Sequence, residues 1–147
     1  MQVKIRPATQ DDAPAAVGLM AQLAEFGHGQ VDPGVEERFR TMIESPQYAI
    51  LVADAGQGQV VGLLTMSQRW TLWHTGPCAF IEELVVDEGG RRQGIGRALL
   101  QAALDWAKAQ GCSEVELSTE PDNLKAQAFY RRLGFESIAL LLEYELD

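Results

Sequence analysis

Cysteine and histidine are scarce in this chain of 147 residues, which contains two of each. Cys78 and Cys112 lie far apart, so a disulfide framework is not expected, and the reducing cytosol is the natural compartment for such a chain. His28 and His74 stand alone in sequence, without other ligand residues at the spacing of a metal site. The sequence therefore predicts no metal ion, and it predicts surface or loop positions for both histidines.

Long apolar runs and an excess of positive charge are also missing. No run approaches the ~20 apolar residues of a membrane span, and the first residues lack the apolar core of a signal peptide. Lys and Arg number 12 against 21 Asp and Glu, which gives a formal net charge of −9. A general nucleic-acid binder would carry the opposite sign or a clustered basic face. We expect neither nucleic acid nor membrane as a partner, whereas an acidic surface can attract cationic small molecules or basic peptides.

What the chain does contain is a series of strand and helix patterns, in the order strand, two helices, two-stranded hairpin, strand, helix, strand, helix and strand. Its length is near the commonest domain size, so we expect one domain over residues 1–147. The order of elements predicts an α/β fold with a mixed sheet. Periodicity and turn residues predict strands over 3–6, 48–53, 60–66, 79–86, 113–119 and 135–146, and helices over 11–25, 34–43, 94–110 and 121–133.

The stretch from residue 78 to 100 has the order buried strand, polar loop, helix start. A loop of free backbone N–H groups at a helix N-terminus, flanked by arginines, is suited to a phosphate or pyrophosphate. A P-loop is excluded, because Gly-Lys-Ser/Thr is absent. A dinucleotide fingerprint fits poorly, because Leu99 replaces its third glycine and seven polar residues separate the strand from Gly94. A nicotinamide-binding oxidoreductase is therefore the weaker alternative.

Two motifs in this order resemble those of the Gcn5-related N-acetyltransferase (GNAT) family. The first is Arg91-Arg-Gln-Gly-Ile-Gly96, which is similar to the acetyl-CoA pyrophosphate loop Arg/Gln-x-x-Gly-x-Gly/Ala. The second is Asn123-Leu-Lys-Ala-Gln-Ala-Phe-Tyr-Arg-Arg-Leu-Gly-Phe135, which is similar to Asn-x-x-Ala-x-x-Phe-Tyr-x-x-x-Gly-Phe. The resemblance implies a mixed, mostly antiparallel central sheet with splayed parallel strands and flanking helices. It also implies acetyl-CoA as a co-substrate and no metal.

The resemblance implies a cofactor site made of a strand edge, a loop and the last helix. The pantetheine arm would pair with the exposed backbone of one strand, and the pyrophosphate would lie on the loop. Glycine at 94 and 96 removes the Cβ atoms that would block close approach. The residues concerned are Leu84, Val85, Val86, Arg91, Arg92, Gln93, Gly94, Ile95, Gly96, Arg97, Asn123 and Phe129.

Acetyl transfer to an amine needs a neutral amine, a polarised carbonyl and a proton for the leaving thiolate. The resemblance assigns the proton donor to Tyr130. Glu82 and Glu83 interrupt an apolar strand, where carboxylates are unusual unless they are paired or functional. Strand alternation predicts that they point to opposite faces. We expect Glu82 to be the base and Glu83 to bind substrate or support the sheet, with two sheet-end carboxylates bonded to Arg or Trp as the alternative.

Further residues are candidates for the walls of the acceptor site. Trp70, Trp73 and His74 precede the central strand and could hold an ammonium by cation–π contact, or pack in a hairpin or at a dimer surface. The loop over residues 26–33 is a candidate lid by position.

The function expected from these residues is transfer of an acetyl group from acetyl-CoA to a primary amine of a cationic small molecule, by direct attack. The alternatives are a non-catalytic acetyl-CoA-binding regulatory module and an acetyltransferase acting on a protein amine. Many family members are dimers, which leaves a homodimer open.

Overall fold

The computed structural model describes residues 2–26 and 30–146, so the prediction made for His28 lies outside the described residues. The chain divides into two compact units, Met1–Glu116 and Leu117–Asp147, which are described separately below. The prediction of a single domain stays a prediction. Among the helices of the described residues, none is long and apolar enough to cross a membrane.

One five-stranded sheet, in the order β1-β2-β3-β4-β5, forms the frame of the first unit. Neighbouring strands from β1 to β4 are antiparallel, and β4 and β5 are parallel. The predicted mixed, mostly antiparallel sheet is thereby confirmed. The strands are β1 (Lys4–Pro7), β2 (Tyr48–Asp54), β3 (Val60–Arg69), β4 (Cys78–Val86) and β5 (Glu114–Leu117).

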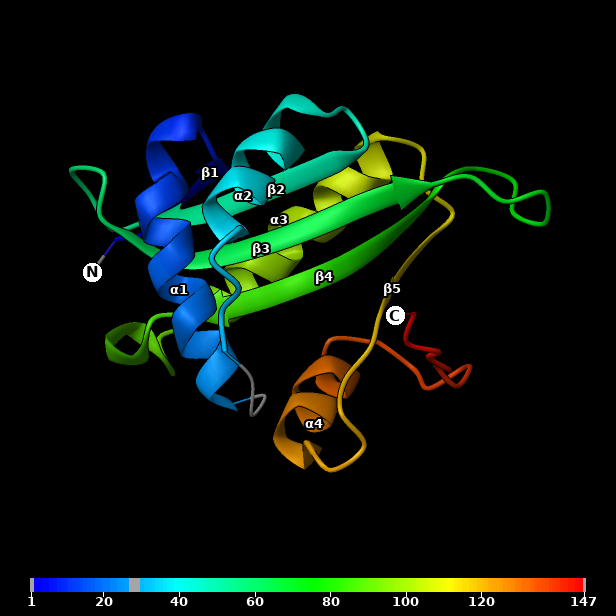
Figure 1. Cartoon of the computed structure of the whole chain (residues 1–147). Helices are drawn as coiled ribbons and strands as arrows, with labels where there is room; N and C mark the ends of the chain where they lie inside the picture. Colours follow the sequence, from blue (N-terminus) through cyan, green and yellow to red (C-terminus); the bar gives the residue numbers. More distant parts are fainter. Residues whose placement is uncertain (1, 27–29, 147) are drawn as a thin grey trace. The chain divides into compact units, whose positions relative to one another are not determined.

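Helices cover both faces of this sheet (Figure 1). One face carries α1 (Ala13–Phe26) and α2 (Val35–Glu44), and the other carries α3 (Ile95–Ala109). A 3-10 turn, η1 (Gln10–Asp12), leads into α1, and a second, η2 (Glu88–Gly90), precedes α3. Helix α1 has Pro14 in its first turn, where a proline removes no helical hydrogen bond. Glu36 and Glu37 lie in the first turn of α2, where the helix dipole favours negative charge.

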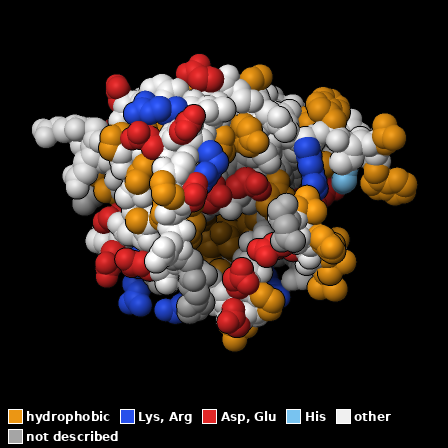
Figure 2. All heavy atoms as spheres, viewed as in Figure 1, with side chains coloured by type: hydrophobic (Ala, Val, Ile, Leu, Met, Phe, Trp, Pro, Cys, Tyr) orange, Lys and Arg blue, Asp and Glu red, His pale blue; other side chains and the backbone are white. Residues whose placement is uncertain are grey.

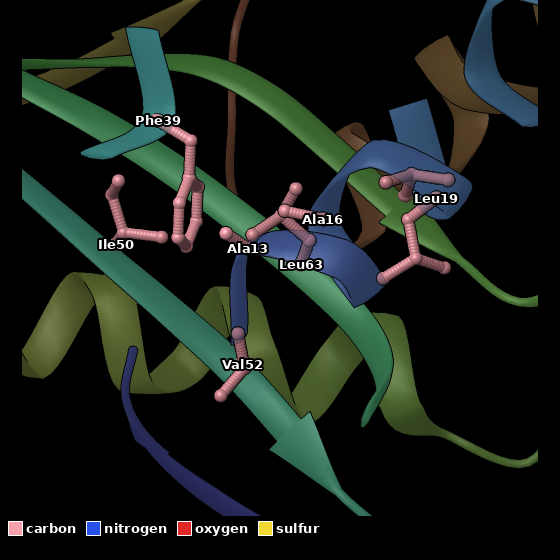
Figure 3. Packing of buried hydrophobic residues seen from close by; sticks show 8 residues of the cluster. Ala13, Ala16, Leu19, Phe39, Ile50, Val52 and Leu63 are labelled. Carbon is pink, nitrogen blue, oxygen red and sulfur yellow. The ribbon is translucent and has the colours of Figure 1, made fainter. Parts of the chain in front are cut away.

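The core on the α1 and α2 side is made of small residues of α1 facing larger ones of the sheet. Figure 3 shows Ala13 and Ala16 beside Leu63, with Phe39 of α2 next to Ile50. All five side chains are less than 9% exposed. Such small-to-large contact brings the helix close to the sheet. The fold of the first unit is held mainly by this burial.

On the opposite face, α3 begins very close to β3. A Cβ atom at Gly62 would lie 2.9 Å from Leu99 Cδ1 and 3.2 Å from Ile95 Cγ2. A side chain at residue 62 would therefore push the start of the helix away from the sheet. The glycine allows the first turn of α3, and the loop before it, to lie against the strand hairpin.

The second unit contains α4 (Leu124–Arg132), which is capped at both ends. The Asn123 side chain accepts a hydrogen bond from the N–H of Ala126 at 3.1 Å. At the other end Gly134 has φ of 103°, and the N–H of Phe135 donates to the Tyr130 carbonyl at 3.1 Å. Together with the bond from the Gly134 N–H to the Arg131 carbonyl at 3.0 Å, this last bond forms a Schellman motif. The two caps explain several positions of the second sequence motif by helix geometry alone.

The predicted strand over residues 135–146 is wrong. Those residues contain neither helix nor strand in the described chain. Their apolar side chains are exposed, with Leu140 at 88% and Leu142 at 87%. Three consecutive leucines also break the alternation that would turn one face of a strand to the core. Apolar β-forming composition alone therefore does not predict a strand without a hydrogen-bonded partner.

Candidate functional site

Strand β4 has one residue more than β3 in the middle of their hairpin. Thr65 pairs with Glu83, but the next residue, Met66, pairs with Ile81, which leaves Glu82 without a partner in the register. Paired residues share a face, and Thr65 and Met66 point to opposite faces, so Glu83 and Ile81 do so as well. This β-bulge interrupts the alternation that placed Glu82 and Glu83 on opposite faces.

Glu83 lies on the face covered by α1 and α2, and Thr65 holds its side chain. The Thr65 hydroxyl donates a hydrogen bond to the Glu83 carboxylate and accepts one, at 3.1 Å, from the Glu83 backbone N–H. Thr65 itself is only 4% exposed. Because its single proton points to the carboxylate, this hydroxyl restricts the orientation of the Glu83 side chain.

Glu82 is exposed, and the atoms around its carboxyl still remove part of its hydration. Burial raises its pKa above the ordinary glutamate value, and the negative charge of Glu83 adds to the rise, while Arg69 opposes it. The influence of Glu83 means that the two carboxylates lie within electrostatic reach of each other. Figure 2, which looks onto the side of α1 and α2, shows acidic side chains gathered near the middle of this side. A carboxyl with a raised pKa is better matched to accept a proton from an amine.

A slot of about 120 Å³ opens beside Glu83. Its walls come from both helices and from three strands, and most of them are apolar. The polar groups among them are Thr65 and Glu83 on the strands and Arg38 on α2. The lining residues are Ala16, Met20, Val35, Arg38, Phe39, Met42, Ile50, Leu63, Thr65 and Glu83.

The last residues of β4 turn part of their backbone away from β3. The N–H of Asp87 donates to the Val61 carbonyl at 2.8 Å, just beyond the ladder. Hydrogen-bonded and non-hydrogen-bonded pairs alternate along an antiparallel ladder. Val85, two residues before Asp87, therefore also points its N–H and C=O groups toward β3, whereas Leu84 and Val86 point theirs away from β3. Of the three strand residues expected to pair with pantetheine, Leu84 and Val86 therefore have backbone groups free of β3. Val85 contributes a side chain to the core.

Strand β5 runs beside only the first part of β4. The Ser113 N–H donates to the Pro77 carbonyl at 2.9 Å, next to the start of both strands. Since the strands are parallel, the four residues of β5 reach along β4 no farther than about Glu82. The Arg91 side chain donates through Nε to the Val86 carbonyl at 3.1 Å, on the side away from β3.

The loop before α3 presents backbone N–H groups at the helix start. The first helical hydrogen bond runs from the Ala98 N–H to the Gly94 carbonyl, at 3.0 Å. The N–H groups of Gly94, Ile95, Gly96 and Arg97 therefore precede the helical ladder. Gly94 has φ of 78°, a left-handed conformation that favours glycine. Together with the helix dipole, this geometry suits an anionic phosphate.

The other loop residues surround this helix start. Arg92 and Arg97 are exposed, and Arg92 has φ of 67°. The Gln93 side chain donates to the Gly89 carbonyl at 3.4 Å, while Ile95 is 4% exposed and packs inward. The predicted cofactor residues from Arg91 to Arg97 are thus brought together at one helix N-terminus.

The remaining predicted residues belong to the second unit. Tyr130 is half-buried on α4, and its ring meets those of Phe129 and Phe135 edge-on, with centroids 5.2 and 5.7 Å apart. Burial raises the pKa of the Tyr130 hydroxyl above its ordinary value. Asn123 caps the same helix.

The aromatic residues before β4 do not line the slot. Trp70 and Trp73 are 73% and 89% exposed, and Figure 2 shows apolar side chains beside the pale-blue histidine there. The Nε2 atom of His74 lies 2.7 Å from Oε1 of Glu114. Its Nδ1 atom lies 2.7 Å from the hydroxyl oxygen of Thr71. Within the described residues, no group of three His, Cys, Asp or Glu could hold a metal ion.

Sequence reasoning did not identify Thr65 or the apolar slot walls. Thr65 lies in a strand of the hairpin whose register depends on the bulge, and only that register sets it opposite Glu83. Phe39 and Met42 are apolar residues at helical spacing in the predicted helix over residues 34–43, which is the pattern of ordinary core residues. Nothing in their spacing distinguishes a slot wall from a packed core.

Comparisons with known proteins agree with this geometry. The model of the acetyltransferase (GNAT) family matches residues 18–135. An aminoglycoside N(6′)-acetyltransferase type 1 from Klebsiella aerogenes is 28% identical over 137 residues, which cover 92% of this chain and 90% of that protein. A mycothiol acetyltransferase from Clavibacter michiganensis subsp. michiganensis is 35% identical over 140 residues, 92% of this chain but 43% of that protein. A solved structure described as a transcriptional regulator from Bacillus halodurans C-125 has a TM-score of 0.88 at 25% identity, covering 99% of this chain and 100% of that one. Since the family match spans most of the sequence, the chain belongs to the acetyltransferase (GNAT) family and is an N-acetyltransferase.

Proposed function

We propose that this enzyme transfers the acetyl group of acetyl-CoA to a primary amine of a cationic small molecule by direct attack. The observation that carries the proposal is the order of groups along one stretch of chain. An acidic bulge at Glu82 and Glu83 is followed by two residues with outward backbone groups, and then by the open N-terminus of α3. Acceptor, thioester and pyrophosphate would thus meet successive parts of the same strand, loop and helix.

Acetyl-CoA would be held mainly by backbone groups. The pyrophosphate would accept hydrogen bonds from the N–H groups of Gly94 to Arg97, and Arg91, Arg92 and Arg97 would add positive charge. The amides of pantetheine would pair with the outward backbone of Leu84 and Val86. The N–H of Val86 is the candidate donor to the thioester carbonyl oxygen.

The amine would lose a proton before it attacks. The Glu82 carboxylate, whose raised pKa suits this role, would accept a proton from the ammonium, while Glu83 holds the substrate. The neutral nitrogen then attacks the thioester carbon and loses a second proton to solvent, and the carbon–sulfur bond breaks as the amide forms. The thiolate takes a proton from the Tyr130 hydroxyl, which solvent restores. The net products are an N-acetyl amine, coenzyme A and one proton.

The relatives differ in their acceptors, which by name are an aminoglycoside and mycothiol. We therefore propose for this chain acetyl transfer to primary amines as a class, and not to either of these two compounds. The test mixes the enzyme and acetyl-CoA with each of a panel of primary amines and measures the release of free thiol. Stabilisation by acetyl-CoA with no thiol release for any amine would favour a non-catalytic binding module. Acetylation of peptides alone would favour a protein acceptor.

A further inference from the structure

We propose that the slot beside Glu83 selects a primary amine carried on a short apolar stem. This inference rests on the proposed function and names the substrate class of the same site. The ammonium would bind the Glu83 carboxylate, and the stem would lie between α1 and α2. Polyhydroxylated amines and diamines would be poor substrates.

The lining of the slot is the first argument. Met20 of α1 faces into it together with Phe39 and Met42 of α2. A stem with hydroxyl groups would lose its hydrogen bonds to water there without gaining new ones, and such unpaired polar groups are strongly disfavoured. Methionine side chains are flexible and polarizable, so they adapt to alkyl or aryl stems of differing shape.

The size of the slot limits the length of the stem. A cavity of about 150 Å³ lined by aliphatic and aromatic residues holds one benzene molecule. The slot measures about 120 Å³. By proportion it accommodates roughly five carbon atoms.

The charges at the slot act in the same direction. Arg38 lines the slot, and its Nη1 lies 2.6 Å from Asp32 Oδ2 in an exposed ion pair. A second ammonium on the stem would meet this guanidinium or the apolar walls. One ammonium fits beside Glu83, and a second has no carboxylate among the residues that line the slot.

Thr65 makes Glu83 a defined anchor. The hydroxyl binds both the carboxylate and the backbone N–H of the same residue, so it holds one rotamer at the bulge. Thr65 is thus a positioning residue for substrate binding. Replacement by valine keeps the shape and removes both bonds, whereas replacement by serine keeps the hydroxyl.

The test compares n-pentylamine with 1,4-diaminobutane, which have the same number of heavy atoms. The far end of the stem is a methyl group in n-pentylamine and a second ammonium group in 1,4-diaminobutane. Glucosamine serves as the hydroxylated amine. We expect kcat/KM for n-pentylamine to exceed that for the other two by at least about tenfold. Met42→Gln, which changes polarity at nearly constant volume, should reduce this preference about fivefold. Ile43→Gln is the matched control on the same helix outside the slot and should leave the preference unchanged.

Thr65→Val should raise KM for n-pentylamine about tenfold while KM for acetyl-CoA stays the same, and Thr65→Ser should restore most of the loss. Equal or better turnover of 1,4-diaminobutane or glucosamine would overturn the proposed substrate class and leave the transferase function standing. An unchanged preference in Met42→Gln would overturn the slot as the acceptor site. Failure of every primary amine would remove the proposed function together with this inference.

Discussion

Both terminal nitrogens of the Arg6 guanidinium donate hydrogen bonds to the carboxylate of Asp12. Nη1 lies 2.9 Å from Oδ2, and Nη2 lies 3.0 Å from Oδ1. The Asp12 side chain is 6% exposed and also accepts the N–H of Thr9 at 2.7 Å. This pair joins the end of β1 to the turn that starts α1, and so it fixes one wall of the slot region to the sheet.

Asp12→Asn should lower the free energy of unfolding by about 2 to 3 kcal/mol, because it leaves the Arg6 charge without its main partner. Urea unfolding monitored by circular dichroism measures this change. Asp32→Asn, which removes a carboxylate from the exposed pair with Arg38, is the matched control and should leave the midpoint nearly unchanged. Equal loss in both variants would contradict the role of burial.

The same pair predicts an acid dependence of stability. Hydrogen bonds from Arg6 hold the pKa of Asp12 below its ordinary value. A lowered folded-state pKa stabilises the protein above the unfolded-state pKa, and the stabilisation is lost as the pH falls through the folded-state pKa. The stability difference between the wild-type protein and Asp12→Asn should therefore be constant above the unfolded-state pKa of Asp12 and narrow progressively as the pH falls below that pKa. A difference that is constant down to the acid transition would argue against the ion pair.

Much of the fold follows from local patterns in the sequence. The hairpin of β2 and β3, the loop before α3 and the capped α4 all have short-range signals in glycine, asparagine and apolar spacing. The bulge at Glu82 has no such signal, because register depends on which strands pair and how the backbone bends. Thr65 and the slot walls depend on that register, so they could not be found either. The apolar residues 135–146 show the limit of composition as a strand signal.

Tyr130→Phe should lower kcat about a hundredfold, because the thiolate would leave without a positioned proton. The KM for acetyl-CoA should change less than twofold, since the ring contacts with Phe129 and Phe135 remain. Tyr144→Phe removes a hydroxyl from a side chain that is 89% exposed and should have no effect. Unchanged turnover in Tyr130→Phe would remove its role as the acid.

Glu82 should control the acidic side of the pH–rate profile. Burial and the charge of Glu83 raise the pKa of Glu82, so kcat/KM should fall on acidification at a pH above the ordinary glutamate range. Glu82→Gln should abolish this limb and lower the rate at neutral pH about a hundredfold. Glu83→Gln removes a neighbouring negative charge and should shift the limb to lower pH. If kcat/KM of Glu83→Gln falls on acidification at the same pH as in the wild-type enzyme, the charge of Glu83 does not influence the pKa of Glu82.

Gly94→Ala should weaken acetyl-CoA binding and also destabilise the fold. Alanine in the left-handed region costs about 1 to 2 kcal/mol, and its Cβ would lie at the proposed pyrophosphate site. Gly111, at the other end of α3, has φ of 79°. Gly111→Ala should therefore cause a similar loss of stability without a loss of acetyl-CoA affinity, as measured by calorimetric titration. Equal affinity losses in both variants would place the effect in the fold and not in the phosphate site.

The extra residue in β4 also governs how this protein can change over evolutionary time. Deletion of Ile81 would set Glu82 opposite Met66 and turn a carboxylate toward the α3 core, whereas deletion of Glu82 would leave Ile81 and Glu83 on their present faces and remove one carboxylate. Substitution at residue 82 leaves the strand pairing unchanged, because this side chain is exposed and has no partner across the ladder. The bulge thus lets the strand carry a second carboxylate without changing the faces of its neighbours. New acceptor preferences in this lineage would then arise by replacement in the slot walls, with the proposed base at Glu82 and the length of the strand held constant.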